Sequence, residues 1–273
     1  MKKLLVGSVY APSPRNATWL RLQRRYLDQS VGRDQYDLAV WLNRVEPGPF
    51  RAEVLAGRSD GDRFDMCEDH AIGLNGLMKF FLDRPDYDYY LVLDSDAFPF
   101  RPAWLEKTIV WLQGCGRLPE RQYAAAVRVE NLDTFPHPCV VFIKGAWLRS
   151  LASPLDHFRW AVRPQTNLVG YRFEDVGLQG GWSQTDGAPW WGPFQPLLRT
   201  NVWSPHPVLA AIYGGMFYHH GAGSRPVELR SVALRQYDHH FPRFSHPELE
   251  ASLYGEVSLN PNLFLNQLAG LPQ

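Results

Sequence analysis

Short apolar runs alternate with amphipathic stretches through the first 112 residues of the chain. The apolar runs have the length of buried strands, and the stretches between them repeat their apolar residues at helical spacing. We expect strands over 3–9 and 37–42, a third strand that starts at 89 and carries Asp94 and Asp96, and helices over 17–30, 67–83 and 103–112. This β-α-β-α-β-α order predicts a largely parallel, doubly wound sheet flanked by helices, so the expected fold class is α/β.

The predicted helix over 67–83 carries signals at both ends. Asp65, followed three residues later by Glu68, resembles a capping box, and Pro85 ends the helical stretch. Apolar residues occupy most of the helix circumference, which predicts a well-buried helix. They are Ile72, Leu74, Leu77, Met78, Phe81 and Leu82.

The second half of the chain has a weaker pattern. Two further strands are expected over 123–129 and 139–144, and a short helix over 146–151. Residues 57–62 are predicted to be a polar loop. Residues 164–207 are rich in Gly, Pro, Trp and Gln with little periodicity, which is typical of a functional loop region.

Composition excludes several classes of protein. The 273 residues include 28 Lys plus Arg and 28 Asp plus Glu, so no overall field attracts nucleic acid or an anionic membrane. No apolar run reaches the roughly 20 residues of a transmembrane helix. The three cysteines, Cys67, Cys115 and Cys139, are too scattered for a disulfide framework or a Cys-rich zinc site. They predict reduced thiols in a cytoplasmic protein.

The third expected strand ends in the most informative segment of the chain, residues 89–100. Asp94 and Asp96 are spaced i and i+2, so an extended backbone directs both carboxylates to the same side. The carboxyl end of such a strand is where open α/β sheets bind ligands. Two carboxylates there repel each other unless a cation separates them, and oxygen ligands suit Mg²⁺ or Mn²⁺. The alternative is a plain turn, because Asp and Ser are common turn residues.

An apolar run that ends in Asp94-Ser95-Asp96 resembles the metal-binding signature of GT-A glycosyltransferases, which move a sugar from a nucleotide diphosphate to an acceptor. The resemblance implies a GT-A-like mixed, mostly parallel sheet in a single domain over 1–273. Its nucleotide-sugar-binding half would be 1–112, and its loop-rich acceptor half 113–273. It also implies Mn²⁺ or Mg²⁺ as cofactor, a UDP- or GDP-sugar donor, a carbohydrate or small-molecule acceptor, and a role in polysaccharide biosynthesis.

Glu174 and Asp175 form a second acidic motif, expected just before a loop or helix. In many inverting glycosyltransferases an acid pair at about this distance beyond the metal motif supplies the general base, and the resemblance favours Asp175 over Glu174. Such a base is needed because a neutral hydroxyl is a poor nucleophile, and base assistance contributes about 10²- to 10⁴-fold in rate. The alternative is an acidic helix N-terminus stabilised by the helix dipole.

A third motif follows an apolar run at 216–218. His219 and His220 lead into a Gly-rich turn with Arg225. In several metal-dependent glycosyltransferases a late histidine completes the metal site; either histidine fits, although adjacent strand residues cannot both face inward. Arg225 would hold the diphosphate. The segment is similar to the His-x-x-Gly-x-x-Lys-Pro motif of a retaining family, but it is one residue shorter and has Arg for Lys. Inversion is favoured, and retention stays open.

The resemblance also places the donor near the ends of the first two strands, and Asn75 on the helix before the metal motif could face it. The donor-binding candidates are Tyr10, Ala11, Pro12, Asn43, Asn75, Asp94, Ser95 and Arg225. Gly180, Gly181, Trp182, Trp190 and Trp191 would line the acceptor side, or the tryptophans would simply pack in the core.

Three other functions remain open. A nucleotidyltransferase shares the sheet and the acids, but usually has a Gly-rich phosphate loop after the first strand, where this chain has Ala-Pro-Ser-Pro-Arg at 11–15. A phosphatase with an aspartyl nucleophile would need Asp94 exposed to a phosphoryl group, and usually has Thr or Val where Phe98 stands. A non-enzymatic carbohydrate-binding protein would explain the tryptophans but would leave the acids without a role.

Overall fold

The computed structural model describes residues 4–13, 16–61, 65–114, 119–128, 135–166, 172–179, 187–192 and 211–219. A seven-stranded sheet, in the order β10-β6-β7-β4-β1-β2-β3, forms its centre. The strands are β1 (Leu4–Tyr10), β2 (Tyr36–Asn43), β3 (Val54–Ser59), β4 (Tyr89–Asp94), β6 (Tyr123–Arg128), β7 (His137–Lys144) and β10 (Gly187–Gly192). β7 runs antiparallel to its neighbours β4 and β6, and every other pair in this sheet is parallel. The predicted mixed, mostly parallel α/β class is therefore confirmed.

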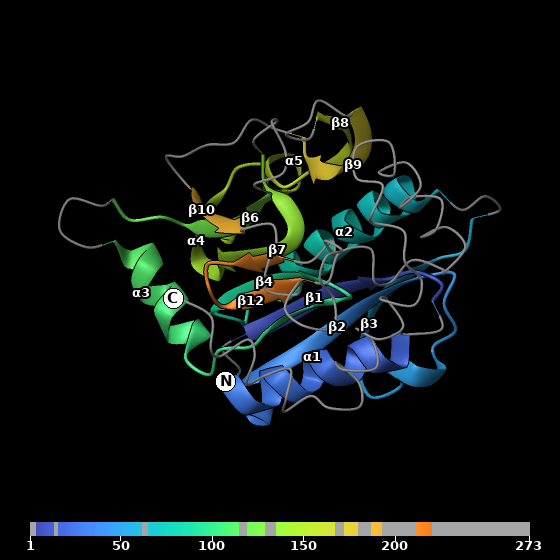
Figure 1. Ribbon diagram of the computed structural model, residues 1–273, viewed down its shortest axis with the longest axis horizontal. Helices are drawn as coiled ribbons and strands as arrows, with labels where there is room; N and C mark the ends of the chain where they lie inside the picture. Colours follow the sequence, from blue (N-terminus) through green and yellow to red (C-terminus); the bar gives the residue numbers. More distant parts are fainter. Residues whose placement is uncertain are drawn as a thin grey trace, which may run out of the picture.

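Helices cover both faces of the sheet (Figure 1). They are α1 (Asn16–Ser30), α2 (Met66–Leu82), α3 (Trp104–Gln113), α4 (Gly145–Ser150) and α5 (Pro154–His157), with 3₁₀ turns η1 (Arg33–Gln35) and η2 (Gly48–Phe50). Side chains of β1 alternate between two cores: Leu4 and Val6 pack with α1 and α3, whereas Leu5 and Val9 pack with α2. Because all seven residues of β1 are buried, this strand is covered on both faces.

The direction of winding reverses between β1 and β4. From β1 the chain passes to β2 and β3 on one side, and then α2 returns it to β4 on the other side of β1. Open α/β sheets bind ligands at such a switch point, outside the carboxyl ends of the strands. Val9 and Asp94 are paired there, at the ends of β1 and β4.

The N-terminus of α2 differs in detail from the expected capping box. The Asp65 carboxylate accepts hydrogen bonds from the backbone N–H groups of Cys67 and Glu68, each at 2.9 Å. The backbone N–H of Asp65 donates to the carboxylate of Asp69, at 3.1 Å, and not to Glu68 as in a capping box. Ile72 is 50% exposed, so α2 keeps one open side and is less buried than predicted.

The predicted loop at 57–62 is wrong at its start, because β3 continues to Ser59 as an edge strand. Its residues are half-buried or exposed, so it lacks the long apolar run that marks the central strands. The indole ring of Trp41 explains two glycines nearby: a Cβ atom at Gly57 or at Gly76 would overlap with this ring. Glycine at these positions lets α2 and β3 approach Trp41 closely.

The Ala-Phe-Pro segment after the metal motif forms a short strand. β5 (Ala97–Pro99) pairs antiparallel with β12 (Phe217–His219), which pairs with β11 (Ala211–Tyr213). Gly214 and Gly215, with φ of 56° and 67°, form the tight turn between β11 and β12. Two positive φ values in succession are typical of a type I′ hairpin, which glycine adopts without strain.

The expected loop region also contains regular structure. β8 (Trp160–Thr166) and β9 (Arg172–Leu178) pair antiparallel, and β10 joins the edge of the main sheet beside β6. Glu174 and Asp175 therefore lie within β9, not ahead of a helix. The sequence pattern missed these strands because Gly, Pro and charged residues interrupt their apolar positions.

Candidate active site

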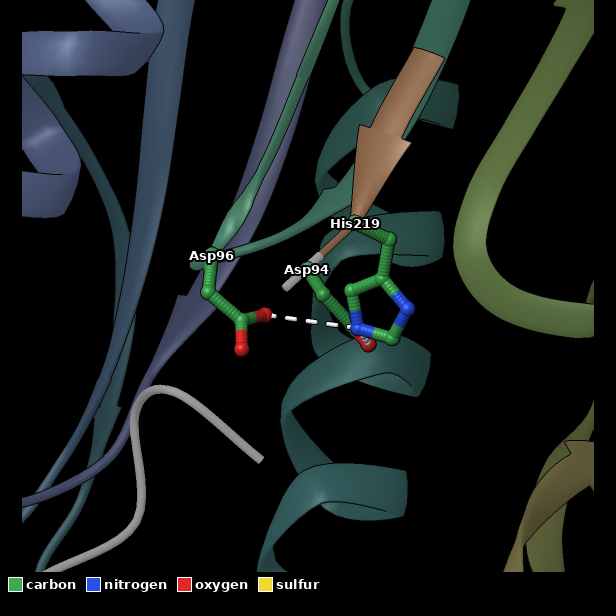
Figure 2. Close-up of side chains that lie close together, drawn as sticks. All are labelled: Asp94, Asp96 and His219. Carbon is green, nitrogen blue, oxygen red and sulfur yellow. Dashed lines mark ion pairs between the residues drawn. The ribbon is translucent and has the colours of Figure 1, made fainter. Parts of the chain in front are cut away.

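Asp94, Asp96 and His219 converge at the carboxyl end of β4 (Figure 2). One ligand atom from each residue lies within 4.8 Å of the others. His219 Nε2 is 3.3 Å from Asp94 Oδ2 and 3.4 Å from Asp96 Oδ1. Strand pairing produces this meeting, because His219 is the partner of Ala97, the residue directly after Asp96. Of the two candidate histidines, the structure brings His219 to the acids, and His220 lies outside the described residues.

Burial makes the charges of this cluster strongly interdependent. Desolvation by itself raises the pKa of Asp94, but His70 and His219 hold it well below its ordinary value. Desolvation likewise lowers the pKa of His219, yet Cys139, Asp96 and Asp94 raise it well above the usual range. The imidazolium of His219 therefore stabilises the carboxylates in this state of the protein.

His70 is a member of the site that the sequence did not indicate. It lies in the first turns of α2, and its Nε2 atom is 3.2 Å from Asp94 Oδ1. α2 follows β3, so its N-terminus lies at the edge of the sheet that carries the strand ends. That topology was the available signal, since polar side chains in the first turns of such a helix reach the ligand-binding edge.

The donor set fits a divalent cation. Two carboxylates suit Mg²⁺ or Mn²⁺, and an imidazole adds a ligand that transition ions accept more readily. Asp94 Oδ1 is buried, and the ring of His70 lies beside it as an ion pair. A buried carboxylate is stabilised by positive charge, so the site favours a cation nearby.

Gln23, on α1, holds the backbone that carries the two acids. Its Nε2 group donates to the carbonyl oxygens of Asp94 at 2.7 Å and Ala97 at 2.9 Å. Its Oε1 atom accepts from the hydroxyl of Tyr10 at 2.9 Å. Gln23 is completely buried, so water does not compete for these hydrogen bonds, and they fix the turn between β4 and β5.

A second pair of groups lies next to the metal-binding candidates. His137 Nε2 is 3.0 Å from Asp175 Oδ2, and the centroid of the His137 ring is 6.3 Å from that of His219. Asp175 and Glu174 are neighbours on β9, so their side chains point to opposite faces. The face with Asp175 meets His137, whereas Glu174 is exposed.

The thiol of Cys139 connects the two groups. It interacts with the rings of both His137 and His219, and it is completely buried. Burial raises the pKa of Cys139, but the two histidines lower it by more, so that its pKa falls to about 7. A continuous polar path thus leads from the carboxylates of β4 through His219, Cys139 and His137 to Asp175.

Three of the predicted donor-binding side chains have partners within the scaffold. The Tyr10 ring is buried in the core beside α1. Asn43 is buried, donates to the carbonyl of Asp69 at 2.8 Å, and accepts from the indole of Trp41 at 3.0 Å. Asn75 exchanges two hydrogen bonds of 2.9 Å with the backbone of Trp160. These contacts hold the loops and strands around the site.

The other donor candidates are distributed as follows. Ala11 and Pro12 are partly exposed after β1, and Ser95 is buried between the two acids. Some predicted residues lie outside the described part of the chain: Gly180, Gly181, Trp182, His220 and Arg225. Trp190 and Trp191 belong to β10, whose backbone alone is described at these positions.

Comparison with solved structures finds several nucleotide-sugar transferases among the similar chains. The mannosyltransferase PcManGT from Pyrobaculum calidifontis, in complex with GDP-Man and Mn²⁺, is 13% identical over 58% of this chain, with a TM-score of 0.38. The match covers 50% of the mannosyltransferase, so this chain corresponds to about half of that protein. The galactosyltransferase LgtC, in complex with donor and acceptor sugar analogs, is 14% identical over 56% of this chain and 62% of its own, with a TM-score of 0.37.

A third similar structure is the glycosyltransferase GlyE from Streptococcus pneumoniae, 16% identical over 55% of this chain and 36% of its own, with a TM-score of 0.34. No family model and no curated protein matches the sequence. Similarity of this extent does not decide an activity, which has to be judged from the side chains of the site. Among the described helices, none is both long enough and apolar enough to cross a bilayer.

Proposed function

We propose that this protein is a glycosyltransferase that moves a sugar from a nucleoside-diphosphate donor to an acceptor hydroxyl, with a divalent cation and with inversion of configuration. The observation that carries the proposal is the meeting of Asp94, Asp96 and His219 at the switch point of a mostly parallel sheet. A diphosphate needs a cation to neutralise it, and this edge of the sheet is where nucleotides bind.

The proposed reaction divides its work between two groups of residues. A divalent cation, held by Asp94, Asp96 and His219, would neutralise the charge that develops on the diphosphate. Asp175 takes the proton of the acceptor hydroxyl, and the oxygen attacks the anomeric carbon. The bond from that carbon to the diphosphate oxygen breaks as the new bond forms, and the nucleoside diphosphate departs with the bonding electrons.

His70, His219 and Gln23 fix the acids before any substrate arrives. The Asp94 carboxylate is aligned by a histidine on each oxygen, and Gln23 holds its backbone. Preorganised groups lower a barrier because they need not reorient during the reaction. We further propose a UDP- or GDP-sugar as donor and a carbohydrate or small molecule as acceptor.

Thermal unfolding with nucleotide and metal tests the donor site directly. UDP and GDP are each added with and without Mn²⁺ to the wild type and to Asp96→Asn. A ligand at 100 times its Kd adds about 2.7 kcal/mol, which raises Tm by several degrees in a chain of this size. We expect a shift that requires both nucleotide and Mn²⁺ and that disappears in Asp96→Asn.

Asp86→Asn is the matched control, because Asp86 is exposed and precedes β4 at the opposite end of the strand. This variant should shift like the wild type. The donor site proposed here would be contradicted if neither nucleotide raised Tm with Mn²⁺, or if Asp96→Asn responded as the wild type does.

A further inference from the structure

His137 is a buried histidine that no motif in the sequence marks, yet it touches the proposed base. Its Nε2 atom lies 3.0 Å from Asp175 Oδ2, and its Nδ1 atom lies 3.3 Å from the backbone nitrogen of Cys139. The ring of His137, on β7, therefore contacts the backbone of β7 through one nitrogen and a side chain of β9 through the other. This contact joins two strands that belong to different sheets.

The backbone contact decides where the ring carries its proton. A backbone N–H can only donate, so Nδ1 of His137 accepts from Cys139 and holds no proton in the neutral ring. The proton is then on Nε2, which faces Asp175. His137 therefore donates to the carboxylate of Asp175.

Exposure decides which member of the pair can meet a substrate. The side chain of His137 is 3% exposed and that of Asp175 is 14% exposed. Both ring nitrogens of His137 contact protein groups, so the more exposed carboxylate of Asp175 is the member of the pair that can reach a substrate. The arrangement is the reverse of a triad in which an acid orients a catalytic histidine.

A second contact fixes the other oxygen of the carboxylate. Asp175 Oδ1 accepts from the N–H of Val176 at 2.8 Å. With Oδ2 bound to His137, the carboxyl plane is set from both sides and cannot rotate freely. Reacting groups held in one orientation save entropy that would otherwise add to the barrier.

We propose that His137 is a positioning residue that orients Asp175, through a hydrogen bond from Nε2, for abstraction of the proton from the acceptor hydroxyl. This inference rests on the proposed function, because it assigns a partner to the base of that reaction. The competing explanation is structural: His137 would serve only to satisfy the backbone N–H of Cys139.

Two variants of His137 separate these explanations. Gln can donate from a position close to that of Nε2, so His137→Gln keeps the bond to Asp175. Asn can accept near the position of Nδ1, so His137→Asn keeps the bond from Cys139 but does not reach Asp175. The assay is release of UDP or GDP from UDP-glucose or GDP-mannose in Mn²⁺, with water as acceptor, by the full chain.

If His137 positions the base, His137→Asn should lose about 10- to 100-fold in kcat, as variants of such supporting partners commonly do, with little change in the donor KM. His137→Gln should keep most of kcat. Asp175→Asn should lose kcat more severely, and adding His137→Asn to it should cost little more. If His137→Asn were active and His137→Gln impaired, the inference would be overturned, although Asp175 could still be the base.

The result for the wild type distinguishes failure of the inference from failure of the proposed function. No nucleotide release from either donor by the wild type would overturn the proposed function and this inference with it. Full activity in Asp175→Asn would show that Asp175 is not the base, and the role proposed for His137 would be wrong as well. Thermal unfolding of each variant, and its Tm shift with nucleotide and Mn²⁺, establishes that the donor site is intact.

A second measurement does not depend on activity. The ¹⁵N resonances of the His137 ring report its tautomer. They are assigned as the signals that are absent from the spectrum of His137→Gln. We expect a protonated Nε2 whose proton exchanges slowly with water, and faster exchange in Asp175→Ala. A ring protonated on Nδ1 alone would overturn the inference.

Discussion

Each oxygen of the Asp94 carboxylate lies beside a histidine nitrogen. His70 Nε2 is 3.2 Å from Oδ1, and His219 Nε2 is 3.3 Å from Oδ2. The two rings come from α2 and β12, so two separate elements hold the acid. His70 is an outer partner, which orients a metal ligand and raises metal affinity although it need not touch the ion.

Removal of His70 should therefore weaken metal binding without unfolding the protein. We expect His70→Ala to reduce Mn²⁺ affinity about 10- to 100-fold, because Asp94 loses the group that aligns it. Isothermal titration of Mn²⁺ in the presence of the bound nucleotide measures the change. His157→Ala is the control, since His157 lies in an aromatic cluster with Trp147 and Phe158. Equal Mn²⁺ affinity in the wild type and His70→Ala would show that His70 has no part in the site.

At the scale of elements, α1 supports the metal-binding turn through packing as well as through Gln23. The ring of Tyr26 stacks on Phe98 of β5, with centroids 4.4 Å apart and an angle of 3° between the planes. The Tyr26 hydroxyl is buried and has no hydrogen-bond partner among the described residues. A buried hydroxyl without a partner costs about 1 to 3 kcal/mol.

Tyr26→Phe should accordingly raise the free energy of unfolding by about 1 kcal/mol, because the stacking on Phe98 remains and the buried hydroxyl is lost. Burial raises the pKa of Tyr26 to about 12, against about 10 for an unfolded tyrosine. A raised pKa stabilises the fold fully below pH 10, and this contribution is lost as pH rises through 12. The variant should therefore lose less stability between pH 10 and 12, as measured by denaturant unfolding.

Tyr36→Phe provides the matched control, at the start of β2. The Tyr36 hydroxyl donates to Asp28 Oδ1 at 2.8 Å, so its removal breaks a hydrogen bond that the fold does contain. We expect the free energy of unfolding to fall by about 1 kcal/mol. If Tyr26→Phe destabilised the protein as much as Tyr36→Phe, the Tyr26 hydroxyl must have a partner.

On the scale of the whole molecule, the elements that the sequence predicted are those whose signals are local. β1, β2, β4 and the helices α1 and α2 follow from apolar runs and helical periodicity. β3 and β5 were missed because they form by pairing with strands that carry the stronger signal. β5 has three residues, and its partner β12 lies far along the chain.

The residues of the candidate site likewise divide into those with a local sequence signal and those without one. Asp94 and Asp96 were predictable, because a strand and a spacing of two suffice to bring them together. The choice of His219 over its neighbour depends on the register between β12 and β5, which no local pattern encodes. His70 and His137 are single histidines in unremarkable surroundings, and only the packing of α2 and of β9 brings them to the acids.

This assembly from distant segments predicts how ligands should change the protection of the backbone. Mn²⁺ with the bound nucleotide ties His219 to Asp94 and Asp96, so it should slow hydrogen exchange in β12 and in β5. β1 and β2 are central and buried, and their exchange should change least. Hydrogen–deuterium exchange with and without EDTA measures both regions in one experiment. Asp96→Asn should abolish the added protection of β12, because the cation would lose Asp96, one of its ligands, which lies just after β4. Protection that persisted in this variant would mean that the ligands order β12 without joining it to the acids.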